Sequence, residues 1–461
     1  MSKTFRAYDP EQLLMLPPSV QEWLPEDHEV HFVNDVVASL DLWAIYGSYD
    51  EERGYPPYHP LLMTKLLVYG YVRGVHSSRQ LARACQERVD FRVLTAGQQP
   101  DFRTIAGFRS RHLSALADLF EQVVKLCREA GLVKLGHVAV DGTKVRANAS
   151  KHKAMSYGRM DRESKRLRAQ IESDLEQWAA TDAAEDARYG AGRRGDELPE
   201  HLADRQKRLA VIEAAKAALE AEAIEKGRTD PSVALPPPAP PPRRAEPNPP
   251  PPRPDPKAQR NFTDPDSRIM LSSDKAFIQA YNAQLAVDAS SQVIVATEVL
   301  QAANDRGQLP AMIDRVEASV GARPKAISAD AGYWGAEDIE RVEAAGTEAF
   351  VAPRKYRHRE WHEMTPPRGR MPNTMGARAR MERKLRTKRG RAEYNKRKVT
   401  VEPVCGQIKH AIGFRQFSLR GHTKVRAEWS IVCMAHNLRK LFRAGWTPPR
   451  GPLTAAAVGI G

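Results

Sequence analysis

The feature that most constrains the fold is a run of prolines between residues 231 and 256, where 14 of 26 positions are proline. Proline has no backbone N–H and fixes its own φ, so this run forms polyproline II or disordered chain and cannot enter a core. Residues 158–228 before it are rich in Ala, Glu, Arg and Lys, with apolar residues at helical spacing, which predicts two antiparallel helices. We therefore expect residues 151–256 to be a helical and proline-rich insertion.

The chain before the insertion has the pattern of a helical bundle. Apolar residues recur at i, i+3 and i+4 over 61–69 and again over 113–124, so residues 1–130 are predicted to form an all-helical N-terminal domain. Two short helices expected near 79–86 and 102–112 carry several arginines, among them Arg103 and Arg109. They are candidates for a DNA-reading helix pair, although ordinary helix pairs are commoner.

A different pattern begins at residue 131. A short apolar strand is expected over 135–142, two alternating strands over 277–301, and then a helix, a strand, a helix and a strand up to residue 353. This order predicts an α/β domain with a mixed sheet and flanking helices. It is formed by residues 131–150 and 257–445, with a last helical region over 394–443 and a tail from 446 to 461.

Positive charge is concentrated at one end of the chain. The whole sequence has 71 Lys and Arg against 57 Asp and Glu, whereas residues 351–461 have 26 against 6. A net charge of +20 there, and of −6 in the rest, predicts a polyanionic partner such as DNA, with a solvated basic face as the alternative. The densest part, 354–398, has 17 basic residues and 4 Glu, and we expect it to follow the DNA backbone without reading bases.

Two aspartates occupy positions typical of an active site. Asp141 and Asp330 are each expected at the end of a strand, with Gly142 and Gly332 close behind them. Ligands of open α/β sheets bind at the carboxyl ends of strands, and paired carboxylates there suit Mg²⁺. A turn is the alternative for either Asp alone. An aspartyl-phosphate mechanism is disfavoured because Ala139 stands where its nucleophilic Asp is needed.

Several ordered motifs over about residues 5–445 resemble the DDE transposases of bacterial insertion sequences, specifically the IS1182-like group of the IS4 and IS5 assemblage. The motifs are HSSRQLARAC, PDFRTIAGFRSRH, HVAVDGTKVRANAS, RNFTDPDSRIM, FIQAYNAQLAVD, ISADAGYW and YNKRKVTVEPVCGQIKHAIGFRQFSLRG.

The resemblance implies a ribonuclease-H-like catalytic domain that carries Asp141, Asp330 and Glu402. It implies Mg²⁺, for which Mn²⁺ can substitute, and metal-dependent cleavage and transfer of DNA strands. The partners would be terminal inverted repeats and target DNA, bound by a homo-oligomer.

The resemblance also implies phosphate contacts near Glu402. They would come from Tyr394, Arg397 and Lys409. The gap between Arg397 and Glu402 is one residue longer than in the usual signature, so Lys398 is an alternative for the basic role.

Glu402 is preferred over Glu382 and Glu393, which are embedded among Arg and Lys. Pro403 is tolerated in a first helical turn, so Glu402 is expected at the start or at a kink of a helix that continues to Lys409.

The remaining candidates have simpler interpretations. Trp334 follows Asp330 closely enough to stack on an unpaired base, but packing is the commoner role of such a residue. Asp288 is expected in a hairpin turn. The histidines without metal-ligand spacing are expected to be structural or phosphate-facing: His137, His410 and His422.

The composition excludes other classes of protein. The four cysteines show no paired spacing, and no apolar run suits a membrane span or a signal peptide, so we expect a cytoplasmic, nucleoid-associated protein.

Two further functions remain as alternatives: a catalytically inactive transposase-derived repressor, and an adaptor that recruits partners through polyproline. Intact Asp141, Asp330 and Glu402 argue against the first, and the predicted sheet argues against the second.

Overall fold

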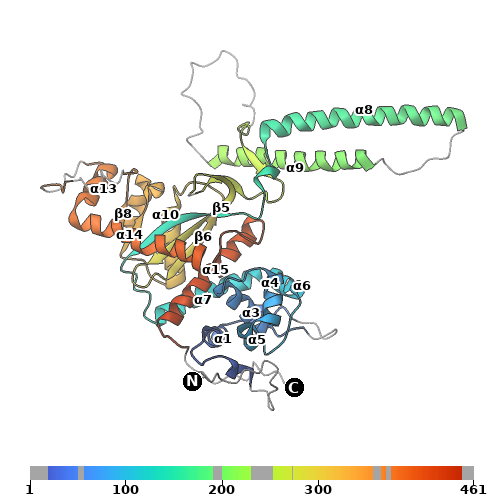
Figure 1. Cartoon of the computed structure of the whole chain (residues 1–461). Helices are drawn as coiled ribbons and strands as arrows, with labels where there is room; N and C mark the ends of the chain where they lie inside the picture. Colours follow the sequence, from blue (N-terminus) through green and yellow to red (C-terminus); the bar gives the residue numbers. More distant parts are fainter. Residues whose placement is uncertain are drawn as a thin grey trace, which may run out of the picture.

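The computed structural model describes residues 19–49, 57–189, 200–229, 253–272, 274–356, 365–369 and 375–448. Most of the proline run and of the predicted tail lies outside these residues. Figure 1 shows a helical bundle, a sheet with helices packed around it, and a long helical arm that projects from the sheet.

The N-terminal bundle confirms the predicted helical character of this part of the chain. Proline at the first position of α3 costs no helical hydrogen bond, and Asp101 caps α6 by accepting from the N–H of Arg103. The two predicted arginine-rich helices are α4 and α6, which pack together, but α5 lies between them and was not predicted. The helices are α1 (Glu29–Ser39), α2 (Trp43–Tyr46), α3 (Pro60–Val72), α4 (Ser78–Glu87), α5 (Val89–Leu94), α6 (Phe102–Arg111) and α7 (Leu113–Glu129).

The main sheet is mixed, as predicted. Strand β1 (Val138–Arg146) pairs antiparallel with β5 (Phe277–Asp288) on one side and parallel with β7 (Ala326–Ala329) on the other. Strand β8 (Glu348–Val351) continues the parallel half. Along the outer edge of β5, β4 (Arg268–Leu271) and β6 (Ile294–Leu300) pair with opposite halves of that strand. Helices α10 (Gln308–Val320) and α11 (Ala336–Ala344) connect the later strands.

The predicted hairpin is confirmed in β5 and β6. Asp288 ends β5, as predicted for a turn residue, and its Oδ1 accepts from the N–H of Ser290 at 2.8 Å. Its Oδ2 also accepts from the N–H of Leu135 at 2.7 Å, so the same carboxylate fixes the segment that leads into β1.

Strand β1 is longer than the sequence indicated. Asp141 was expected to end a strand, with Gly142 as a turn residue, but β1 continues to Arg146 and both residues lie within it. The antiparallel pairing with β5 extends over the whole strand, whereas the parallel pairing with β7 stops at Val140. Asp141 therefore lies where the parallel pairing ends rather than where the strand ends.

The arm is formed by the insertion. The two predicted antiparallel helices are α8 (Tyr157–Tyr189) and α9 (Glu200–Thr229), which pack along each other (Figure 1). At their base, β2 (Ala154–Ser156) pairs with β3 (Gln259–Asn261) in a separate two-stranded sheet. As predicted, the described part of the insertion adds no strand to the main sheet.

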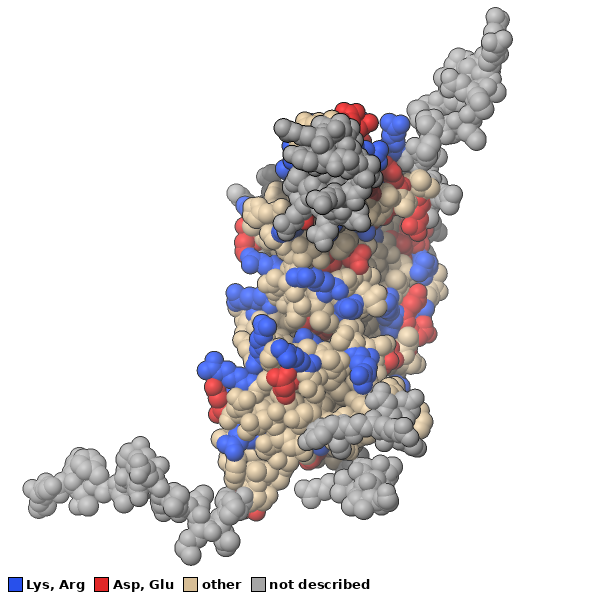
Figure 2. All heavy atoms as spheres, turned by 90° about the vertical axis from the view of Figure 1, so that its right-hand side faces the viewer, with Lys and Arg blue, Asp and Glu red and all other residues tan. Residues whose placement is uncertain are grey.

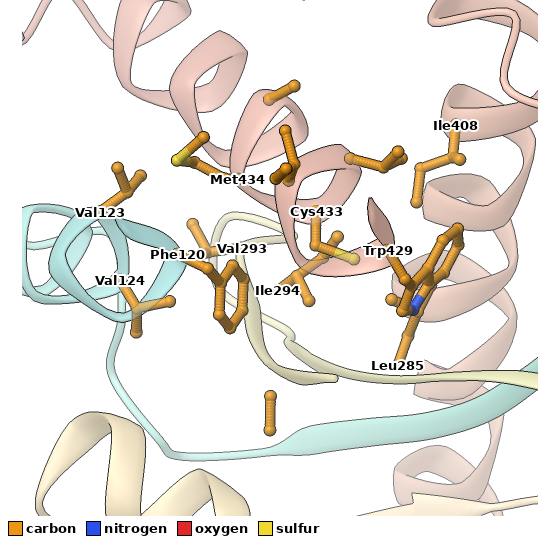
Figure 3. Packing of buried hydrophobic residues seen from close by; sticks show 14 of the residues in the cluster. Phe120, Val123, Val124, Leu285, Val293, Ile294, Ile408, Trp429, Cys433 and Met434 are labelled. Carbon is orange, nitrogen blue, oxygen red and sulfur yellow. The ribbon is translucent and has the colours of Figure 1, made fainter. Parts of the chain in front are cut away.

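The last helices join the sheet to the bundle. They begin at Ala377, earlier than the predicted 394, and are α13 (Ala377–Arg386), α14 (Lys388–Gly406), the π-helical turn η5 (Gln407–Ala411) and α15 (His422–Arg443). Helix α14 crosses the strands from β5 to β8. Helix α15 packs against α7, α3 and β6, and Figure 3 shows its Met434 and Cys433 among side chains of α7 and of the β5–β6 hairpin. One hydrophobic cluster therefore runs through the bundle and the sheet.

Candidate active site

The sheet brings Asp141 and Asp330 to the same edge. Val140 and Ala329 are paired in the parallel register, so the aspartate that follows each of them stands at the same level. Asp141 Oδ1 accepts from the N–H of Gly142 at 2.8 Å. Asp330 caps the short helix η4 (Ala331–Tyr333), and its Oδ1 accepts from the N–H of Gly332 at 2.8 Å. A backbone N–H within β1 thus fixes the carboxylate of Asp141, and a backbone N–H of η4 fixes that of Asp330.

Helix α14 carries Glu402 to this edge. Glu402 lies near the end of the helix, not at its start, and Pro403 lies inside the helix. Proline leaves the carbonyl of Val399 without its usual helical donor, and the side-chain amide of Gln292 donates to that carbonyl at 2.9 Å. The helix then changes to the π-helical turn η5. The part of the prediction that places Glu402 at an irregularity of the helix agrees with this geometry.

Arg397 connects two of the three carboxylates. Its Nη1 lies 3.5 Å from Asp141 Oδ2 and 3.1 Å from Glu402 Oε1. The guanidinium is largely buried and also lies 5.8 Å from the ring centroid of Tyr394. Burial alone would lower the pKa of Arg397. The neighbouring negative charges, of which Asp141 is the strongest, raise the pKa by more than burial lowers it, so the net shift is upward. Arg397 is thus a fixed countercharge between the strand and α14.

The electrostatics of Asp141 indicate a concentration of negative charge. Burial raises the pKa of Asp141 to about 6, and Asp330 and Asp305 add to the increase, whereas Arg397 lowers it. A buried carboxylate with further carboxylates close to it forms a favourable environment for a cation.

Asp305 is an acidic residue of this edge that the sequence analysis missed. It lies between β6 and α10, and its Oδ1 accepts from Asn282 Nδ2 at 2.6 Å and from Gln284 Nε2 at 2.7 Å. Lys144 Nζ lies 3.8 Å from the same oxygen. The signal in the sequence was the pair of amide side chains Asn282 and Gln284 in the middle of a buried strand, because buried amides need polar partners.

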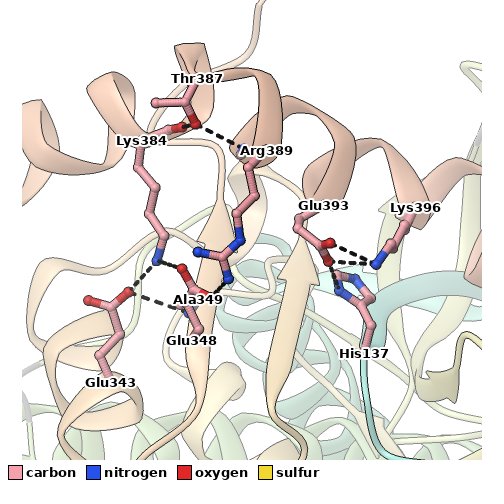
Figure 4. A network of polar contacts seen from close by, with 10 residues as sticks. His137, Glu343, Glu348, Ala349, Lys384, Thr387, Arg389, Glu393 and Lys396 are labelled. Carbon is pink, nitrogen blue, oxygen red and sulfur yellow. Dashed lines mark hydrogen bonds and ion pairs between the residues drawn. The ribbon is translucent and has the colours of Figure 1, made fainter. Parts of the chain in front are cut away.

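The two competing glutamates are engaged elsewhere. Glu393 Oε2 lies 2.8 Å from His137 Nδ1, and both its oxygens accept from Lys396 (Figure 4). Glu382 pairs with Arg354 and Arg378. Each therefore balances local positive charge, as the sequence analysis expected.

The other residues predicted to contact phosphate differ in how exposed their side chains are. Tyr394 is partly buried, Lys398 is exposed, and Lys409 lies half-buried on η5. Cys405 lies on α14 between Glu402 and Lys409, and burial raises the pKa of its thiol to about 12, with Asp141 and Glu402 adding to the shift and Lys409 opposing it.

The remaining residues singled out from the sequence have structural partners. Trp334 packs against the core. His137 Nε2 lies 2.8 Å from Ser328 Oγ, and His422 Nε2 lies 2.6 Å from the carbonyl oxygen of Val299. His410 Nδ1 lies 3.0 Å from Arg415 Nη2.

The two N-terminal arginines differ in placement. Arg103 is exposed on α6, and its guanidinium lies 5.5 Å from the ring centroid of Phe102. Arg109 is 9% exposed and donates to the carbonyl of His76 at 2.9 Å. This placement corrects the expectation for Arg109, whose guanidinium holds two parts of the bundle together and does not face solvent.

Part of the basic segment is neutralised within the chain. Lys384 bridges Glu343 and Glu348, Arg389 pairs with Glu348, and Arg380 pairs with Glu340, so α13 and the start of α14 dock on α11 and β8 (Figure 4). Positive charge also lies outside this segment. Figure 2 shows Lys and Arg spread over the face below the arm, where acidic side chains are fewer.

The residues at this edge fit a divalent cation in chemistry. Asp141, Asp330 and Glu402 are hard oxygen donors, and the pKa of Asp141 is raised mainly by burial, with Asp330 and Asp305 adding to the shift. In the described part of the chain, however, no three His, Cys, Asp or Glu side chains are arranged to hold a metal ion. Arg397 instead lies between Asp141 and Glu402 in this structure.

Two family models match the chain. A transposase domain (DUF772) matches residues 18–111, and a transposase DDE domain matches residues 369–442. The chain has the domain architecture of an IS1182-family transposase. The first match covers the bundle from α1 to α6, and the second contains Glu402, whereas Asp141 and Asp330 lie outside both.

The matches confirm the resemblance seen in the sequence and indicate a transposase-type enzyme that acts on DNA. No curated protein and no solved structure gives a significant match. Among the described helices of the chain, none has the length and apolar character needed to cross a membrane.

Proposed function

We propose that this transposase cleaves and joins DNA strands with divalent metal ions at Asp141, Asp330 and Glu402. The observation that carries the proposal is their convergence: Asp141 and Asp330 follow paired residues of adjacent strands, and Arg397 links Asp141 to Glu402. The strand order β6-β5-β1-β7-β8, with an antiparallel half and a parallel half, supports a ribonuclease-H-like catalytic domain.

The carboxylates would hold Mg²⁺, or Mn²⁺ in its place. A metal ion in such a site supplies an activated water or 3′-hydroxyl and stabilises the leaving oxygen of an in-line displacement at phosphorus. Asp141 and Asp330 give the site rigidity because the sheet register and local backbone N–H groups fix them. Glu402 is more exposed, with 47% of its side chain accessible, and approaches from α14.

The basic side chains near Glu402 would hold the DNA strand. Arg397 offers a planar fork for phosphate oxygens, and Lys409 a point charge. Tyr394 lies beside Arg397 and supports its guanidinium. In this proposal the natural substrates are the terminal repeats of the element and a target duplex, and the active form is a homo-oligomer on DNA.

The sharpest test compares Glu402→Gln with Glu393→Gln. Both substitutions remove one negative charge from α14 and keep the shape of the side chain. The substrate is a duplex that carries the DNA flanking the gene. Glu402→Gln should reduce its Mg²⁺-dependent cleavage by orders of magnitude, while the affinity of the protein for the duplex is retained. Glu393→Gln is the matched control and should cleave like the unaltered chain. Normal cleavage by Glu402→Gln together with loss in Glu393→Gln would reverse the assignment.

A second test concerns the basic segment. Arg386, Lys388 and Lys398 are exposed, and within the described residues they form no ion pair. Replacing all three with Gln should weaken binding to flanking and random duplexes alike and lower the salt dependence of both, since backbone contacts carry no sequence information. A loss confined to the flanking duplex would instead place base recognition in this segment.

A further inference from the structure

A largely buried lysine lies beside Asp305, on the strand that carries Asp141. Lys144 follows Asp141 on β1, and 19% of its side chain is exposed. Burial lowers the pKa of Lys144, and Asp305, Asp141 and Asp330 partly offset that effect. In the described part of the chain its ammonium forms one ion pair, at 3.8 Å to Asp305 Oδ1, and donates no hydrogen bond. An ammonium has three donors, so Lys144 retains donors for a ligand.

Asp305, the partner of Lys144, is firmly held. Asn282 and Gln284 both donate to its Oδ1, and both amides are fully buried in β5. In the sheet register Lys144 is paired with Asn282, and Gly142 with Gln284. Side chains alternate along a strand, so these four positions lie on one face of the sheet and Asp305 covers that face.

The face leaves no room for a side chain at position 142. A Cβ on Gly142 would lie 2.7 Å from Asp305 Oδ1 and 2.8 Å from Asn282 Oδ1. Asn282 Oδ1 is itself buried and has no hydrogen-bond partner among the described residues. Unpaired buried acceptors are uncommon, so this polar cluster is not explained by packing alone. A Cβ on Gly332 would likewise lie 3.2 Å from Asp305 Oδ2, which places Asp305 against the turn that carries Asp330.

We propose that Lys144 binds a phosphate of the DNA strand at the carboxylate site and that Asp305 is the residue that positions it. The proposal rests on the proposed function, because the phosphate is the one held next to Asp141 and Asp330. Three carboxylates repel a phosphate, and a fixed ammonium reduces that repulsion where the backbone must approach most closely. Gly142 and Gly332 are then required because a side chain at either position would meet the Asp305 carboxylate.

The first experiment measures binding without metal. Affinity for a duplex carrying the flanking DNA is determined in EDTA over a range of salt concentrations. Lys144→Met should reduce the slope of log affinity against log salt by about one, as expected for one lost phosphate contact. Lys325→Met is the matched control: Lys325 is exposed just before β7, at the opposite end of the sheet, and its substitution should leave the slope unchanged. An unchanged slope for Lys144→Met would overturn the proposal.

The second experiment tests the positioning role of Asp305. Lys144→Met should lower Mn²⁺-dependent cleavage about 10- to 100-fold, and Asp305→Asn should lower it less. The double variant should be no worse than Lys144→Met alone, since a positioning residue has nothing to position once the lysine is gone. If the fold-losses in cleavage of the two single variants multiply in the double variant, Asp305 does not act by positioning Lys144. Circular dichroism and thermal melting verify that each variant is folded.

Mn²⁺ affinity separates this proposal from the proposed function. Lys144→Met should keep Mn²⁺ binding, whereas Asp141→Asn should lose it. If the unaltered chain neither binds Mn²⁺ nor cleaves DNA, the proposed function fails, and the salt slope of Lys144→Met still decides whether Lys144 binds phosphate. If the unaltered chain cleaves and Lys144→Met cleaves equally well, only the proposal for Lys144 fails.

Discussion

The arm and the central body of the molecule are held together by different interactions. The buried cluster of the arm is small and consists of Met160, Leu167, Ile212, Ala215 and Leu219. Around it lie ion pairs such as Arg168–Glu213 and Arg208–Glu163, in which the arginines are exposed and the glutamates are partly buried. The central cluster instead runs without a break from the N-terminal bundle through the sheet to α15. Because the body has a continuous buried cluster of its own, it should be stable without the arm.

The largest expected difference between the two regions is in how much a buried substitution lowers the free energy of unfolding of the body. Trp429 is fully buried on α15, beside Phe414 and Phe417, and its Nε1 donates to the carbonyl of Gln284 at 3.2 Å (Figure 3). Trp429→Ala should lower the free energy of unfolding of the body by about 3–5 kcal/mol. The matched substitution in the arm, Leu167→Ala, should leave the melting of the body unchanged.

Hydrogen exchange measured by mass spectrometry locates both effects. Trp429→Ala should reduce protection in α15, α7 and the β5–β6 hairpin, whereas Leu167→Ala should reduce protection in α8 and α9 alone. Reduced protection of the sheet in Leu167→Ala would show that the arm and the body unfold as one unit.

The second prediction concerns acid stability of the body. His436 is buried on α15 next to the carbonyl of Gln292, and burial lowers its pKa to about 4. A folded-state pKa below the unfolded value means that the neutral ring stabilises the fold fully above about pH 6.5. That stabilisation, about 3 kcal/mol, is lost as the pH falls from about 6.5 to 4.

His436→Gln removes this titrating group and keeps an N–H donor for Gln292. Between about pH 6.5 and 4.5, the slope of unfolding free energy against pH should fall by up to about 1.4 kcal/mol per pH unit in this variant. Chemical denaturation at several pH values measures the slope. A slope equal to that of the unaltered chain would mean that His436 titrates alike in the folded and unfolded states.

The third prediction concerns the ion pairs of the arm. Glu163 pairs with Arg166 on its own helix and with Arg208 on α9. Glu163→Gln should cost the arm less than about 1 kcal/mol, and less again at high salt, because its arginine partners are exposed and solvent and ions screen their charges. Exchange protection of α8 and α9 at low and high salt measures the effect. A larger cost that persists at high salt would show that the pairs hold the arm together.

The two regions also differ in how far their structure could be predicted. Local periodicity was enough for α8 and α9, for the β5–β6 hairpin and for the order of later strands and helices. It was enough to place Asp141 and Asp330 at one edge of the sheet, because each directly follows an apolar strand segment and the two segments are parallel neighbours. It failed where tertiary contacts decide: Gly142 has the pattern of a turn, but pairing with β5 keeps β1 extended through it.

Side-chain partners distant in sequence were the main gap. The role of Asp305 depends on Asn282, Gln284 and Lys144, which come from other elements. Likewise the docking of α13 on α11 depends on ion pairs across 40 residues and more of sequence, such as Arg380–Glu340 and Lys384–Glu343. No local pattern encodes such contacts, so the basic segment was treated as uniformly available for DNA.

The smallest effect is expected from removing the arm altogether. Replacing residues 158–256 with a short Gly/Ser linker keeps β1, β5 and β7 and all the carboxylates of the site, because β2 and β3 form their own two-stranded sheet at the base. The unfolding midpoint of the body and its affinity for Mn²⁺ should therefore match those of the full chain, whereas assembly on paired DNA ends is free to change. Calorimetric titration with Mn²⁺ and thermal melting measure the two quantities. Weaker Mn²⁺ binding with an unchanged unfolding midpoint would show that the arm shapes the carboxylate site, and the arm and the body could then no longer be treated as independent.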